Sequence, residues 1–245
     1  MPAIVLTTHK SAMAGMNASD NFTSLREAGD SDFATLNTNS TQIIAVKLAR
    51  SSGRGGTSFQ FQRAYFAYDF TGYGTAAGTM SDLQWNFTGT SASSGDHTVR
   101  LVKNTAFGTG ISVDYDSGNW WDSLDLTTPY NPSSGANATW ADGTTDQVWD
   151  LDADARTDAQ SDEFLKFTAM NYEFDFLDDA PTVNVADISY INNQLISGVT
   201  KAFISFSWTP TATGYENTVN AIIPANISKI LGVPTLNISK VNGVL

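Results

Sequence analysis

The chain has 245 residues, and its 41% content of hydrophobic residues is enough to form one large hydrophobic core or two small ones. It contains no cysteine, which excludes disulfide frameworks, thiolate metal sites and cysteine nucleophiles. Its formal net charge of −12, without a basic cluster to offset it, makes nucleic acid and anionic membranes unexpected partners.

The composition predicts an all-β protein. Charged residues make up only 16% of the chain, whereas long helices usually contain many glutamate, lysine and arginine residues. Aromatic residues make up 11%, and serine, threonine, asparagine and glycine are abundant. This mixture is typical of strands that are joined by many loops.

Four segments stand out in the first part of the chain. Residues 11–18 have small side chains and a mildly helical pattern. Thr41–Leu48 has the composition of a strand, and the glycine-rich residues 51–57 are expected to form a flexible loop. The clearest strand signal follows in Ser58–Phe70, which is rich in aromatic residues.

The apolar positions of this aromatic segment change phase. Phe59 and Phe61 share one alternation, whereas Ala64 and Phe66 share the other. A slip of one residue moves all later side chains to the opposite face of a strand. The pattern therefore predicts one strand with a bulge near Arg63, or two strands in succession.

Later segments also alternate or have strand composition. The expected strands are Asp82–Thr88, Thr98–Lys103, Ile111–Tyr115, Gln147–Asp152, Phe164–Phe176 and Lys201–Trp208. Within Phe164–Phe176, Glu173 and Asp175 alternate with aromatic residues, so both carboxylates are expected to face solvent.

Many short strands without regular helices between them favour an antiparallel β-sandwich of the jelly-roll type over a parallel sheet. No linker is evident before about residue 209. We therefore expect one sandwich domain over residues 1–208, including an N-terminal arm, and a C-terminal tail over residues 209–245.

The sequence does not predict an enzyme. Its two histidines, His9 and His97, lie in different segments, and no nucleophile-elbow sequence is present. Glu173 and Asp175 offer a carboxylate pair of the kind that glycosidases use, which leaves a glycan-cleaving enzyme as a remaining alternative.

A tryptophan-rich loop suggests a glycan-binding surface. Aromatic rings stack on the C–H groups of sugars, and nearby amides and carboxylates bind the hydroxyls. The alternative is that Trp120 and Trp121 plug the end of the sandwich, and Trp149 is expected in the core. The candidate glycan-binding residues are Trp120, Trp121, Tyr130 and Trp140.

Acidic residues suggest a calcium site. Asp114, Asp116 and Asp122 lie in a loop and have the oxygen ligands that calcium prefers. Asp150 and Asp152 begin a pattern similar to an EF-hand loop but lack its later residues. A solvated acidic face is favoured over a specific site, the first cluster is the better calcium candidate because it lies in a loop, and no other cofactor is expected.

The chain ends in a short repeat. Asn226–Val233 and Asn237–Val244 share the pattern Asn-Ile-Ser-Lys-x-x-Gly-Val, and each copy is compatible with one helical turn ended by glycine. One turn is not stable alone, so its apolar residues must be buried against this domain or a neighbouring subunit. The candidate assembly residues are Ile227, Ile230, Val233, Ile238, Val241 and Val244.

Residues 63–72, Arg-Ala-Tyr-Phe-Ala-Tyr-Asp-Phe-Thr-Gly, resemble a strand and turn of jelly-roll domains of the DNRLRE/carbohydrate-binding type, followed by Met80–Trp85 in place of a later strand. The Trp-Trp-Asp loop, the Thr-Pro-Tyr sequence at 128–130 and Phe164–Asp175 are similar to domains in structural proteins of tailed bacteriophages. The repeated tail also resembles tails of phage particle proteins.

This resemblance implies a non-enzymatic virion protein, most simply a capsid decoration, fibre or knob protein. Its implied partners are other virion proteins, such as the major capsid protein or tail proteins, and further copies of itself, for which a trimer is one expectation. The alternative function is a carbohydrate-binding adhesin that uses the loop at residues 119–149.

Overall fold

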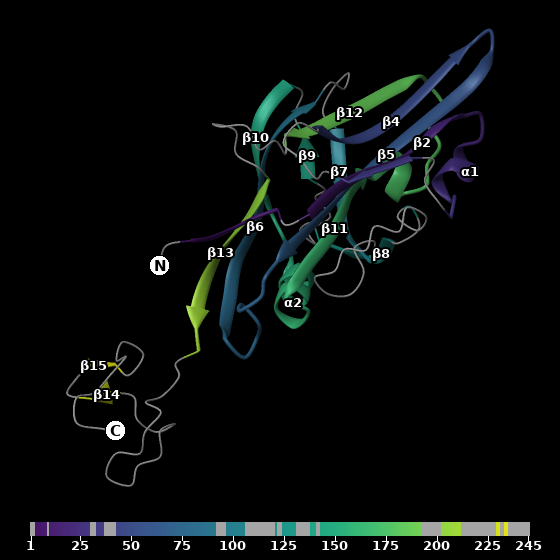
Figure 1. The fold of residues 1–245 in the computed structure, drawn as a ribbon. Coiled ribbons are helices and arrows are strands. Elements are labelled where there is room, and N and C mark those ends of the chain that lie inside the picture. The colour runs from purple at the N-terminus through teal and green to yellow at the C-terminus, as the bar shows by residue number, and fades with distance from the viewer. Residues whose placement is uncertain are drawn as a thin grey trace.

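The computed structural model describes residues 3–8, 10–29, 33–36, 43–91, 97–105, 121, 124–130, 138–140, 143–192, 202–211, 229–230 and 233–234. Most of them belong to strands (Figure 1). The strands are β1 (Ile4–Thr7), β2 (Lys10–Ser19), β3 (Phe33–Leu36), β4 (Ile43–Gly53), β5 (Gly56–Asp69), β6 (Gly78–Ser91), β7 (His97–Asn104), β8 (Leu124–Pro129), β9 (Ala138–Trp140), β10 (Gly143–Asp150), β11 (Phe164–Asn171), β12 (Val185–Asn192), β13 (Phe203–Pro210), β14 (Lys229–Ile230) and β15 (Val233–Pro234). The helices are α1 (Phe22–Arg26), α2 (Ala153–Ser161) and a π-helical turn (Tyr172–Phe176).

Thirteen of these strands form one antiparallel sheet. Its main path runs β1-β13-β6-β12-β4-β5-β11-β7-β8, while β10 pairs with β6, β2 with β3 and β5, and β9 with β7. The sheet folds over a core, because the ring centroids of Phe66 in β5 and Trp85 in β6 lie 5.0 Å apart, and those of Phe70, just after β5, and Phe206 in β13 lie 5.5 Å apart. The structure therefore confirms the predicted all-β, antiparallel, sandwich-like fold.

Strand β5 is buried on both of its faces. Its residues Phe66 and Tyr68 belong to a large core cluster with β6, β11 and β13, whereas Phe61 and Tyr65 belong to a second cluster with β2, β4 and α1. β5 is one strand, and its register with β2 is continuous from Phe61 through Arg63 to Ala67. The predicted bulge near Arg63 and the predicted break into two strands are therefore both wrong, since the change of phase marks the point where the second face also becomes buried.

Two other early predictions are wrong. Residues 11–18 are not helical but lie in β2, because Ala12 and Ala14 are small enough to be fully buried beside β5. Most of the predicted loop at residues 51–57 belongs to strands, with only Arg54 and Gly55 between β4 and β5. A positive φ of 109° at Gly56 fits this tight connection, since glycine adopts that conformation without strain.

The later strand predictions have mixed outcomes. The predicted strands at 82–88, 98–103 and 201–208 correspond to β6, β7 and β13, while residues 111–115 lie outside the described residues. The predicted strand at 147–152 ends at Asp150, because Asp152 is the N-cap of α2 and accepts hydrogen bonds from the backbone nitrogens of Asp154 and Ala155.

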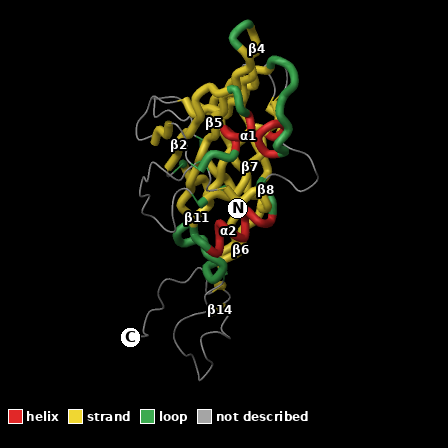
Figure 2. The backbone as a smooth tube through the Cα atoms, turned by 90° about the vertical axis from the view of Figure 1, so that its right-hand side faces the viewer, coloured by secondary structure: helices red, strands yellow, loops and turns green. Residues whose placement is uncertain are grey.

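The helices cover different parts of the sheet. Figure 2 shows α1 toward the end of the molecule where β4 lies, and α2 toward the opposite end, beside β6 and β11. Among the described residues, neither helix has the length and apolar character that crossing a bilayer requires.

The described part of the C-terminal repeat is a β-hairpin. Lys229 pairs with Pro234 and Ile230 pairs with Val233, so β14 and β15 form a separate two-stranded sheet (Figure 1). The predicted helical turn is therefore wrong at residues 229–230. A two-residue connection that contains glycine favours a hairpin, and β-branched residues favour strands.

Candidate functional site

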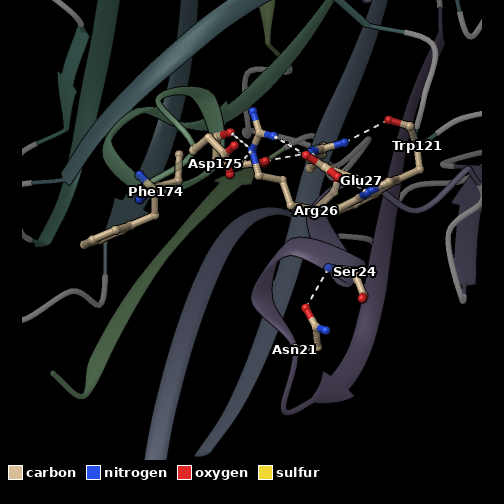
Figure 3. Close-up of polar contacts among 10 residues, drawn as sticks. Asn21, Ser24, Arg26, Glu27, Trp121, Phe174 and Asp175 are labelled. Carbon is tan, nitrogen blue, oxygen red and sulfur yellow. Dashed lines mark hydrogen bonds and ion pairs between the residues drawn. The ribbon is translucent and has the colours of Figure 1, made fainter. Parts of the chain in front are cut away.

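A buried ion pair lies beneath a surface pocket at the α1 end of the sheet. Arg63 donates from Nε to Oδ2 of Asp175 at 2.8 Å and from Nη2 to Oδ1 at 2.6 Å. Figure 3 shows Asp175 among the polar contacts at this end of the sheet, near Arg26. The side chains of Arg63 and Asp175 are only 4% and 2% exposed. This two-point contact uses both carboxylate oxygens, which is the strongest geometry for such a pair.

Local structure turns Asp175 inward. The predicted strand over Phe164–Phe176 ends at Asn171, and residues 172–176 form a π-helical turn. The Asn171 side chain accepts a hydrogen bond from the backbone nitrogen of Phe174 at 2.9 Å, which caps this turn. The prediction that Asp175 faces solvent is therefore wrong, because a helical turn does not alternate its side chains between two faces.

Arg63 also holds Trp121, which belongs to the tryptophan-rich loop. Arg63 donates from Nη1 to the carbonyl oxygen of Trp121 at 2.8 Å, and its guanidinium carbon lies 3.7 Å from the centre of a Trp121 ring. Trp121 in turn donates from Nε1 to the carbonyl oxygen of Arg26, and Arg26 donates from Nε to the carbonyl oxygen of Asp175. The cluster thus joins α1, β5, Trp121 and the π-helical turn.

Electrostatics keep Arg63 charged. Burial lowers the pKa of Arg63, but the Coulombic attraction and hydrogen bonds of Asp175 outweigh this effect, so the pKa lies above its ordinary value. Burial raises the pKa of the neighbouring Tyr65 hydroxyl, so this phenol stays neutral at physiological pH. The site therefore holds a fixed positive charge on Arg63 beside a neutral phenol.

The pocket above this cluster has a volume of about 230 Å³ and a mixed lining. Glu27 is at its polar side, with 56% of its side chain exposed, and Leu126 of β8 is 38% exposed. Among the described residues, the pocket is lined by Arg26, Glu27, Arg63, Trp121, Leu124 and Leu126. Its volume lies below the roughly 300–1,000 Å³ of pockets for drug-sized ligands, so it suits a single side chain or another small group.

The chemistry of the site is that of a structural clamp. Both oxygens of Asp175 accept hydrogen bonds from a permanently charged arginine, so this carboxylate is held as an acceptor and is not placed to move protons. Within the described residues, no group of three potential ligands is arranged to hold a metal ion.

Two of the four predicted glycan-binding residues, Trp121 and Tyr130, are buried. Trp121 and Tyr130 are each 1% exposed, so neither ring is free to stack on a sugar. For Trp121, this agrees with the alternative that it plugs the end of the sandwich. Trp140 is in β9 and pairs with His97, while Trp120 lies outside the described residues. For Trp120 and for the Trp140 side chain, glycan binding stays a prediction.

Tyr130 has a structural environment of its own. Its hydroxyl donates a hydrogen bond to Oδ2 of Asp158 in α2, and Lys103 of β7 contacts the same oxygen at 2.8 Å. Burial and the nearby Asp158 raise the pKa of Tyr130. These contacts attach α2 to the sheet.

The remaining candidates are only partly described. The predicted calcium ligands Asp114, Asp116 and Asp122 lie outside the described residues. Of the assembly residues, Ile230 and Val233 pair in the β14–β15 hairpin. The other four, which likewise lie outside the described residues, are Ile227, Ile238, Val241 and Val244.

The sequence predictions did not include the Arg63–Asp175 pair. An arginine inside an aromatic strand and an aspartate between aromatic residues were the available signals, but 112 positions separate them.

Comparison of the sequence with protein-family models and with curated proteins finds no match.

Proposed function

We propose that this chain is a non-enzymatic structural protein of a phage particle, either a capsid decoration protein or a surface fibre or knob protein. It docks on other virion subunits through its C-terminal segment. The resemblance in the sequence supplies the virion assignment, and the sandwich-like fold is compatible with it.

The observation that carries the docking role is the separate β14–β15 hairpin. Its two strands pair with each other and not with the thirteen-stranded sheet. An isolated two-stranded hairpin is marginally stable at best in water. Ile230 and Val233 therefore need another surface to pack on, and the repeat of the same motif at residues 237–244 offers a second docking unit.

Deletion of residues 226–245 tests the docking role. Co-sedimentation with purified particles should be lost, while the thermal unfolding of the remaining chain stays close to that of the full chain. The double substitution Ile230→Asp with Val233→Asp should weaken association in the same direction, because it places charge on apolar hairpin positions.

The matched control is Val183→Asp, which adds a charge at an exposed apolar residue of the main body; Val183 is 69% exposed. This variant should bind particles normally. If the deleted chain still co-sediments with particles, the docking role is wrong. If the full chain is absent from particles by quantitative mass spectrometry, the virion assignment itself is wrong.

A further inference from the structure

A second pocket lies on the face shared by β6, β10 and β13. In the sheet register, Phe203 of β13 pairs with Asn86 of β6, and Asn86 pairs with Val148 of β10, so these residues form a row across three strands. Thr88 and Asp146 form the next pair. The pocket has a volume of about 190 Å³ and is lined by Asn86, Phe87, Thr88, Asp146, Gln147, Val148 and Phe203.

This pocket has apolar and acidic parts. Val148 is 58% exposed, and Phe203 is half-buried and pairs with Asn86. Asp146 accepts a hydrogen bond from the Thr88 hydroxyl at 2.6 Å, and Asp150 of the same strand accepts one from Gln84 at 2.8 Å. Among the described residues, neither carboxylate forms a salt bridge, so both negative charges remain unbalanced on this face.

An apolar wall beside an unbalanced carboxylate matches the shape of a lysine side chain. The aliphatic stem of lysine packs on apolar surface, and its ammonium group donates to a carboxylate. A pocket of this volume holds one such side chain. An anionic group is disfavoured, because the described lining residues include no lysine or arginine.

The chain itself supplies lysines of this kind. Residues 217–245 contain two of the 13 basic residues, Lys229 and Lys240, and none of the 25 acidic residues. Each lysine occupies the same position in its copy of the repeat, and Lys229 begins β14. Residues 217–245 of the tail are therefore basic, whereas the rest of the chain is strongly acidic.

We propose that the C-terminal tail of one chain docks on the β6–β10 face of a second copy, with a repeat lysine in the pocket between Val148, Phe203 and Asp146. Figure 1 shows β14 and β15 beyond the free end of β13, well away from β10, which favours a neighbouring copy over the same chain. This inference rests on the proposed docking role of the tail, and it names the surface that receives the tail.

The absence of cysteine from the chain makes a crosslinking test specific. A Val148→Cys variant is mixed with a Ser228→Cys variant, which retains both repeat lysines, and a short bismaleimide is added. A crosslink between two different chains then reports that the tail of one copy lies on the pocket of the other. The matched control replaces Val148→Cys by Val183→Cys, whose position is more exposed, at 69%, but lies outside the pocket.

We expect at least a five-fold higher yield of mixed dimers at Val148 than at Val183. Adding Asp146→Asn to the Val148→Cys chain should reduce that yield several-fold. Raising the salt concentration to 1 M should also reduce it, because the screening length falls to about 3 Å. Equal yields at Val148 and Val183, or a yield that is insensitive to Asp146→Asn, would overturn the inference.

The same variants separate this inference from the proposed function. In one outcome, the tail is needed for association with particles, but the crosslink yield is the same at Val148 and Val183 or does not respond to Asp146→Asn. The tail then docks on another surface, and only the receiving surface named here is wrong. If deletion of the tail leaves particle association unchanged while the Val148 crosslink is specific, the tail joins copies of this chain and the docking role on other virion subunits is wrong.

Discussion

The substitution Asp175→Asn is the sharpest test of the buried cluster. The new amide has nearly the same shape as the carboxylate, so it creates no cavity, but it leaves the Arg63 guanidinium without its counter-charge and turns an N–H group toward other N–H donors. Both side chains are at most 4% exposed, so water does not replace the lost partner.

Removal of one partner from a buried ion pair typically costs about 3–5 kcal/mol. The total stability of a folded protein is roughly 5–15 kcal/mol, so the variant should lose a large fraction of it. For a chain of this length, the same loss corresponds to a melting temperature lower by roughly 6–20 °C. Thermal and urea unfolding, followed by circular dichroism, measure both quantities.

Two controls make this prediction specific. Glu173→Gln changes an exposed carboxylate in the same π-helical turn and should alter stability by less than about 0.5 kcal/mol. The double variant Arg63→Met with Asp175→Leu removes both charges and should be more stable than Asp175→Asn alone. An Asp175→Asn stability within about 0.5 kcal/mol of the native chain would refute the reasoning.

Two further predictions concern single carboxylates. Asp152→Ala removes the acceptor that caps α2 and should lower the free energy of unfolding by about 0.5–2 kcal/mol in urea titrations, whereas Asp154→Ala, which removes no cap, should cost less. The pKa of Asp187 is raised from 3.8, chiefly by burial and further by the nearby Glu173. Asp187 therefore binds its proton more tightly in the folded state than in the unfolded state. The stability that this proton contributes is lost as the pH rises from near 4 through the raised pKa. Unfolding experiments at pH 4 and pH 7 should therefore show Asp187→Asn gaining stability relative to the native chain at the higher pH; an unchanged difference would contradict the assigned shift.

Strands with one buried face were predictable from the sequence. In β6 and β13, the apolar residues alternate with polar ones because the opposite face meets solvent, and this pattern is local. The helix α2 also had a local signal, since Asp152 is a good N-cap that precedes several helix-forming residues, but the acidic spacing suggested calcium ligands instead.

The features that sequence reasoning missed depend on distant segments. β5 changes phase because the face of Phe61 packs in the cluster with β2 and α1, whereas from Ala64 onward the opposite face is also covered, in the cluster with β6, β11 and β13, and no residue near Arg63 reveals that cover. The burial of Asp175 depends on an arginine that is 112 positions away. The role of Trp121 was left open for the same reason, since its position in the core is determined by contacts with Arg26 and Arg63.

Because β5 contributes residues to both apolar clusters, the two clusters have no strand boundary along which they can separate. Loss of packing in either cluster exposes one face of a strand that the other cluster needs. We therefore expect the body of the chain to unfold in one cooperative transition. In native-state hydrogen exchange, the backbone amides of β5 should be among the slowest to exchange, and they should open only when the whole sheet opens.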